Sequence, residues 1–158
     1  MKYIKIGKIV NTHGIKGEIR LRSNFQYKDK VFKTNMNIFI GKDKVNKVIN
    51  TYRPHKTFDM ITINGINNIN DVIKYKSKDV FINEIDLILE NNEILIEDLI
   101  DYEIFNNNEF IGTVVNFMNN SAYDLLILDN GKKIPFLDEF IIKIEKKKIY
   151  VNLPEGYL

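Results

Sequence analysis

The side chains best suited to bind phosphate or to move protons fall in two short stretches of the sequence. They are His13, Lys16, Arg20 and Arg22 in the first stretch, and Arg53, His55 and Lys56 in the second. Arginine and lysine bind phosphate through charge and hydrogen bonds, and such binding weakens with salt and reads little base sequence. If the two stretches are neighbours in the fold, they predict a surface that contacts a nucleic-acid backbone. A hairpin with an ordinary solvated outer face fits the first stretch equally well.

The same histidines also suggest a catalytic alternative. A hydrolase acting on RNA would use His13 as a general acid or base together with a carboxylate. The sequence contains no nucleophile elbow, phosphate-binding P-loop or dinucleotide fingerprint. It has no cysteine, and His13 and His55 have no metal-ligand spacing around them. We therefore expect no enzyme, no metal and no cofactor.

A glycine-bracketed hairpin positions the first stretch. Residues 7–22 are predicted to form a strand, a turn and a second strand, in which Gly14 and Gly17 take the turn conformations. Gly7 marks a slip in the apolar alternation, so a bulge or bend is expected there. The second strand places Ile19 and Leu21 on one face, and Arg20 and Arg22 on the other.

Short alternating apolar runs predict a mainly β protein built from two small barrels. In the first half we expect six strands, at residues 3–10, 18–22, 36–40, 45–52, 57–63 and 80–82. One short helix is predicted at residues 68–78, capped by Asn70 or Asp71. A small closed barrel would remove the exposed strand edges. Tyr52 and Phe58 are interpreted as core residues rather than as base-stacking platforms.

The second half repeats this strand-rich pattern. Apolar runs predict strands at residues 102–105, 109–117, 123–128, 132–136, 141–144 and 149–153. We interpret them as a second barrel at residues 98–158. Residues 1–85 form the first domain, and residues 86–97 form a short acidic linker between the two.

Charge is divided unevenly between the two halves. Residues 1–83 hold 17 Lys and Arg against 6 Asp and Glu, a net charge of +11. Residues 84–158 hold 6 against 15, a net charge of −9. A basic module favours phosphate, and an acidic one suits a basic protein surface. Two unrelated solvated surfaces remain the simpler alternative.

Other features of the sequence bear on location. The absence of cysteine fits a reducing compartment. The charged residues among the first five indicate no signal peptide, and no apolar run is long enough to span a membrane. We expect a cytoplasmic protein that acts as a monomer.

Several motifs resemble those of one known family. Residues 7–18, GKIVNTHGIKGE, are similar to the N-terminal signature of the ribosome maturation factor RimM family. Residues 98–100, 111–114, 134–136 and 153–158 resemble the C-terminal half of that family, a PRC-barrel. The resemblance implies a translation-factor-like N-terminal barrel followed by a PRC-barrel. It also implies a non-enzymatic assembly factor that binds the head of the immature small ribosomal subunit and promotes its late maturation and rRNA processing.

The resemblance also implies which residues bind which partner. The seven basic residues named above would contact small-subunit rRNA. Contact with a basic ribosomal protein would fall to Ile94, Leu95, Ile96, Asp98 and Leu99. The family often has two aromatic residues before an Asp-Leu-Ile-Gly motif, whereas this chain has Ile94 to Ile96 there and Asp101 in place of the glycine. The alternative function is a PRC-barrel protein–protein adaptor with no ribosomal role.

Overall fold

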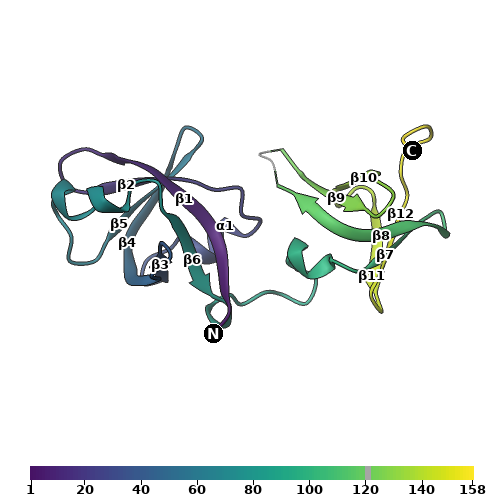
Figure 1. Cartoon of the computed structure of the whole chain (residues 1–158), viewed down its shortest axis with the longest axis horizontal. Helices are drawn as coiled ribbons and strands as arrows, with labels where there is room; N and C mark the ends of the chain where they lie inside the picture. Colours follow the sequence, from purple (N-terminus) through teal and green to yellow (C-terminus); the bar gives the residue numbers. More distant parts are fainter. Residues whose placement is uncertain (120–121) are drawn as a thin grey trace. The chain divides into compact units, whose positions relative to one another are not determined.

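The chain folds as two compact units, residues 1–90 and 91–158, referred to below as the N-terminal and C-terminal units. The structure is a computed structural model that describes residues 1–119 and 122–158 (Figure 1). The division between the units falls within the predicted linker, residues 86–97. Among the described residues, no helix combines the length and apolar character needed to cross a bilayer.

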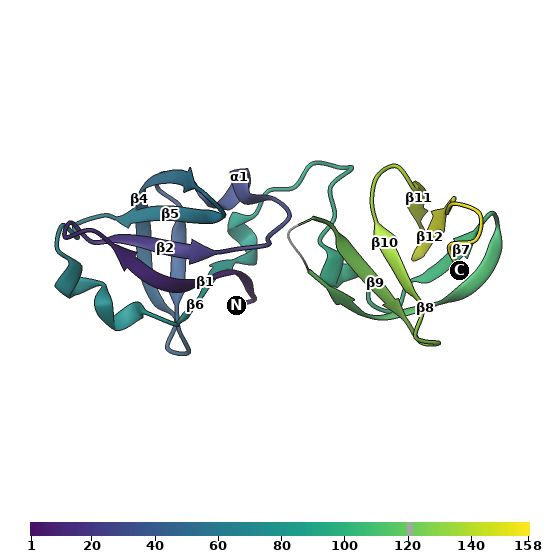
Figure 2. The same cartoon turned by 90° about the horizontal axis from the view of Figure 1, so that it is seen from above.

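The N-terminal unit is a closed six-stranded barrel (Figures 1 and 2). Its strands are β1 (Tyr3–His13), β2 (Glu18–Arg22), β3 (Asn37–Ile40), β4 (Val45–His55), β5 (Phe58–Ile63) and β6 (Asp79–Asn83). The order around the barrel is β1-β2-β5-β4-β3-β6, and β6 pairs with β1 to close it. Closure leaves no free sheet edge, as the sequence predicted.

Alternating apolar residues fill the barrel. Ile19 and Leu21 of β2 and Ile61 of β5 have no exposed surface. Ile19 lies opposite Ile61, so the two strands present their apolar faces to the same interior. The predicted bulge at Gly7 is present, because the β1–β6 register shifts between Lys5 and Gly7.

The prediction of one short helix at residues 68–78 is wrong. The segment forms two 3₁₀ turns, η1 (Ile69–Asp71) and η2 (Ile73–Tyr75), and the side chain of Asn68 caps the first by accepting from the Asn70 amide. Val72 and Tyr75 are the buried residues, and their spacing of three matches the three residues per turn of a 3₁₀ helix. The only α-helical turn in the described part of this unit is α1 (Lys28–Val31).

The C-terminal unit is a six-stranded sheet that curves into a half-barrel (Figure 2). Its strands are β7 (Glu103–Asn106), β8 (Glu109–Met118), β9 (Asp124–Leu128), β10 (Lys133–Phe136), β11 (Ile141–Glu145) and β12 (Lys148–Val151). The order is β10-β9-β8-β7-β12-β11, and β7 and β12 pair in parallel. Leu99, Ile104, Val114 and Ile134 have no exposed surface and lie at the centre of the core.

Two 3₁₀ turns lie in the segment that leads from one unit to the other. They are η3 (Glu84–Asp86) and η4 (Ile96–Leu99). Asp101 follows η4 with a φ of +75°, a left-handed conformation that glycine adopts most readily. Its amide donates to the Val114 carbonyl at 2.8 Å, so this conformation joins the turn to β8.

Candidate nucleic-acid interface

The three arginines of the chain lie on one outer face of the N-terminal barrel. Met60 of β5 lies opposite Arg20 of β2 on one side and opposite Arg53 of β4 on the other. Paired residues in a sheet point to the same side. Ile19 and Leu21 fill the interior, so Arg20, Arg22 and Arg53 project outward together. The two predicted stretches are therefore brought onto one surface.

Phe58 lies beneath two of these arginines. The Cζ atoms of Arg20 and Arg22 are 5.1 and 5.6 Å from the centre of its ring. A guanidinium at this distance from an aromatic face is held by a cation–π interaction. Phe58 is half-buried on the outside of the barrel, so its interpretation as a core residue is wrong. The ring orders two cations, of which Arg22 is exposed and Arg20 is half-buried.

Arg53 is held by a carboxylate. Its Nε and Nη2 atoms donate to the two oxygens of Glu18 at 2.9 and 2.8 Å. These bonds hold the pKa of Glu18 below its ordinary value and raise the pKa of Arg53. A two-point pair fixes the plane of the guanidinium as well as its position.

The two histidines join the same cluster. Nη2 of Arg20 donates to Nδ1 of His13 at 2.9 Å, and the His13 and His55 rings lie 5.8 Å apart. Partial burial lowers the pKa of His55, and the charges of Arg53 and Lys56 lower it further. Protonation of His55 therefore occurs only in more acidic solution than usual.

This geometry disfavours His13 as a general base through Nδ1. Because guanidinium can only donate, Nδ1 of His13 already accepts a hydrogen bond and has no lone pair left for a substrate proton. The nearby carboxylate, Glu18, is engaged by Arg53. No group of three potential ligands in the described ranges is placed to hold a metal ion. The site is arranged for binding.

We call the outward cluster the arginine–histidine face. It consists of His13, Glu18, Arg20, Arg22, Arg53, His55 and Phe58. Lys56 acts on it electrostatically from the β4–β5 turn. Lys16 is exposed on the β1–β2 turn, and no contact in the described part of the chain joins it to the face. Glu18 and Phe58 were missed as site residues, because only the register between β2, β4 and β5 brings them to the arginines.

The predicted turn glycines position the hairpin that carries this face. A Cβ at Gly7 would lie 3.0 Å from the Arg22 carbonyl, so the close approach of the two strands requires glycine. At Gly17, where φ is +89°, it would lie 3.1 Å from the Asn68 carbonyl. The hairpin tip is also held by a bond from the Ile69 amide to the Ile15 carbonyl. The tip therefore rests on η1.

The residues predicted to contact a basic protein lie mostly inside the C-terminal unit. Leu95, Ile96 and Leu99 are 6%, 4% and 0% exposed, and Ile94 packs partly buried against the core. Asp98 is exposed. The consecutive apolar residues Ile94, Leu95 and Ile96 indicated a contact with a partner, but they pack against the core of their own unit. A partner can reach Asp98 but not these buried side chains.

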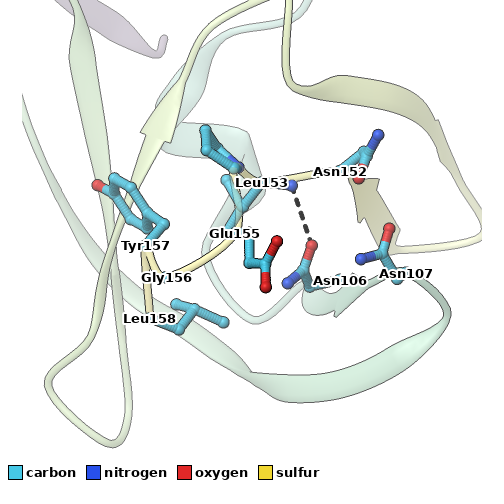
Figure 3. Close-up of a pocket in the computed structure, with 9 residues that line it drawn as sticks. Asn106, Asn107, Asn152, Leu153, Glu155, Gly156, Tyr157 and Leu158 are labelled. Atoms are coloured by element: carbon cyan, nitrogen blue, oxygen red, sulfur yellow. Dashed lines mark hydrogen bonds between the residues drawn. The ribbon is translucent and has the colours of Figure 1, made fainter.

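The C-terminal unit also has an open pocket of about 420 Å³ (Figure 3). Asn106, Asn107 and Asn152 line it together with residues 153–158. The side-chain Oδ1 of Asn106 accepts from the Leu153 backbone amide at 3.0 Å. The lining of this pocket combines three asparagines and the carboxylate of Glu155 with apolar residues such as Leu153.

These features define a two-module β protein with an outward cationic binding face. The family models for the RimM N-terminal domain and the RimM PRC barrel domain match residues 4–87 and 96–157. The chain belongs to the RimM family of ribosome maturation factors, which are not enzymes.

Relatives in this family are similar along the whole chain. The ribosome maturation factors RimM of Staphylococcus aureus strains JH9 and Newman are each 33% identical over 164 aligned residues, covering 98% of both chains. A RimM structure from Pseudomonas aeruginosa is 14% identical, with a TM-score of 0.45 over 97% of this chain and 98% of that one. The N-terminal domain of RimM from Thermus thermophilus is 13% identical, with a TM-score of 0.49 over 56% of this chain and 98% of that one.

Proposed function

We propose that the arginine–histidine face binds ribosomal RNA in the head of the immature small subunit and so promotes its late maturation. The observation that supports this most strongly is the placement of Arg and His. All three arginines and both histidines gather on this face, whereas the chain's 20 lysines are spread along it. Arginine binds phosphate in two-point geometry and stacks on flat rings, which lysine cannot do.

The mechanism we propose is selective binding. Glu18, Phe58 and His13 hold the guanidinium groups in place before any ligand arrives, which lowers the entropy cost of binding. A rigid arrangement of cations fits one spatial arrangement of phosphates better than others. The protein then stabilises the RNA conformation that it fits, without bond chemistry.

The acidic C-terminal unit is proposed to hold a basic ribosomal protein of the same region. Residues 91–158 carry 12 Asp and Glu against 6 Lys, and Asp98 is exposed at the start of the unit. Complementary charge speeds such an encounter and selects the partner. The protein would act in the cytoplasm as a monomer. Replacing Asp98 by Asn should slow association with the subunit, most clearly at low salt.

Binding to immature small subunits tests the proposal for the face. The double variant Arg20→Gln/Arg22→Gln should lose roughly tenfold or more in affinity, and its log–log salt slope should fall by about 2. The control is Lys74→Gln/Lys76→Gln, which removes the same charge from exposed positions outside the face. Equal losses in both variants would show that only net charge matters, and the proposed site would be rejected.

A further inference from the structure

The outer face of the C-terminal sheet carries a row of three aromatic rings. Tyr150 of β12 lies opposite Phe105 of β7, which lies opposite Phe110 of β8. The Tyr150 and Phe105 rings stack at 5.4 Å, and the Phe105 and Phe110 rings meet edge to face at 5.6 Å. We call these three residues the aromatic row.

The row faces away from the core. Ile104 and Ile149, the neighbours of Phe105 and Tyr150 in their strands, have no exposed surface and belong to the core. Since side chains alternate along a strand, Phe105 and Tyr150 project to the other side. Phe110 is 52% exposed, which leaves a large part of its ring open to a ligand.

Lysines cluster beside this row. Nζ of Lys143 is 4.7 Å from the centre of the Tyr150 ring, and Nζ of Lys148 is 5.5 Å from that of Phe105. Lys146 and Lys147 form the β11–β12 turn between them. Four of the six lysines in the C-terminal unit thus lie on one hairpin, although residues 91–158 carry a net charge of −6. Glu145 pairs with Lys143 at 3.1 Å, and Glu103 lies opposite Lys148 in the sheet. The four lysines still outnumber these two carboxylates, so the local charge remains positive.

From this arrangement we propose that the aromatic row binds unpaired RNA, through stacking of bases on the rings and contact of phosphates with the lysines. Aromatic faces accept any nucleobase, and flanking cations neutralise the backbone. In a duplex the bases are already stacked on each other and cannot reach the rings. The ligand is therefore single-stranded. This surface is independent of the arginine–histidine face and gives the chain a second RNA contact, in the other unit.

A single tryptophan can report on this surface, because the chain contains none. Phe110→Trp in the full chain places the fluorophore in the row. Ile88→Trp, at a position 80% exposed in the N-terminal unit, is the matched control. A short oligouridylate should quench the first and leave the second unchanged. Equal quenching of both, or equal quenching by an RNA duplex, would overturn the proposal.

Variants of the row then test the stacking itself. In the Phe110→Trp chain, Phe105→Leu/Tyr150→Leu should weaken oligouridylate binding roughly tenfold. Phe105→Tyr keeps a ring and should preserve affinity. Thermal unfolding of each variant shows whether it is folded. Unchanged affinity in a folded Phe105→Leu/Tyr150→Leu chain would overturn the proposal, as would equal weakening by Phe105→Tyr.

The two RNA-binding proposals can fail separately. Arg20→Gln/Arg22→Gln, added to the Phe110→Trp chain, should leave the oligouridylate quenching in place. Loss of that quenching would show that the signal depends on the arginine–histidine face, and the aromatic row would be rejected. Lys143→Gln/Lys148→Gln should lower the salt slope of quenching by about 1 to 2, and an unchanged slope would contradict the role of these lysines.

Discussion

The Arg53 guanidinium and the Glu18 carboxylate form a two-point ion pair that crosses over an intervening strand. Arg53 belongs to β4 and Glu18 to β2, and β5 lies between them. Met60 of β5 projects to the same side and is nevertheless fully buried. The ion pair therefore ties three strands together and encloses an outward-facing apolar side chain.

The first prediction concerns the acid stability of this pair. The pKa of Glu18 is lowered in the folded state. The ionised carboxylate therefore contributes fully to the free energy of unfolding above the ordinary glutamate pKa of 4.5, and this contribution is lost as pH falls through the lowered value. Glu18→Gln should remove this pH dependence of stability and lower the free energy of unfolding by less than about 1 kcal/mol at neutral pH. Thermal unfolding between about pH 3 and 7 measures it. A wild-type curve parallel to that of the variant would contradict the prediction.

Arg22→Lys separates the shape of the cation from its charge. The substitution keeps the phosphate attraction and loses the flat group that packs over Phe58 at 5.6 Å. Affinity for immature small subunits should fall about threefold to tenfold, while the salt slope stays constant. Lys76→Arg, outside the face, should change neither quantity. Full affinity in Arg22→Lys would show that only the positive charge at this position determines binding.

Tyr52 supports a buried carboxylate on the interior side of the same barrel. Its hydroxyl donates to Asp59 Oδ1 at 2.7 Å, and the Lys28 ammonium lies 2.8 Å from Oδ2. Burial, aided by the Asp59 bond, raises the pKa of Tyr52 from 10 to about 12. Tyr52→Phe should cost about 1 to 3 kcal/mol, because Asp59 loses a buried donor.

The same tyrosine predicts behaviour in alkaline solution. A raised pKa means that the stabilisation is complete below pH 10 and is lost as pH rises through about 12. In an absorbance titration, one tyrosine should ionise near 12, and that step should vanish in Tyr52→Phe. A late step that survives in Tyr52→Phe would assign it to another tyrosine.

The two glycines of the β1–β2 turn should respond differently to alanine. At Gly14, where φ is +77°, nothing lies within 4 Å of the position that a Cβ would take, so Gly14→Ala should cost only the backbone strain of about 1 kcal/mol. Gly17→Ala adds contact with the Asn68 backbone and should cost more, as the tip lifts from η1. Denaturant unfolding measures the loss of stability in each variant. Equal losses would show that the hairpin tip can move away from the Asn68 backbone without further cost.

Asp101 offers a stabilising substitution. Its φ of +75° is a conformation that strains every residue except glycine, so Asp101→Gly should raise the free energy of unfolding by up to about 1 kcal/mol. Asp101→Ala also removes the carboxylate but keeps the backbone strain, and it should not gain stability. Calorimetry of the full chain compares them. Stabilisation by Ala as large as by Gly would assign the effect to charge.

The sequence was sufficient for the hairpin and for the number of strands. Alternation in residues 18–22 separates Ile19 and Leu21 from the arginines by local rules alone, and the structure confirms it. Phe58 was assigned to the wrong side because its face depends on the register of β5 with β2 and β4. That register is fixed by packing across the whole barrel and is not encoded within residues 57–63.

Two other differences also arise from tertiary context. Residues 68–78 have a helical apolar pattern, but the segment is short and only Val72 and Tyr75 reach the core, which a 3₁₀ turn satisfies. The apolar residues at 94–99 indicate burial equally well in a partner or in the chain's own core. The structure places Leu95, Ile96 and Leu99 in the interior of their own unit.

The parallel pairing of β7 with β12 sets an order for folding during synthesis. The N-terminal barrel closes once β6 has left the ribosome, since β6 supplies the last strand beside β1. The second sheet cannot form as early, because β7 pairs with β12 and Glu103 has no partner there until Lys148 has been synthesised. Such distant contacts form slowly. A nascent chain that has emerged only as far as β11 would thus display a finished N-terminal barrel, with its arginine–histidine face, while the second sheet is still incomplete.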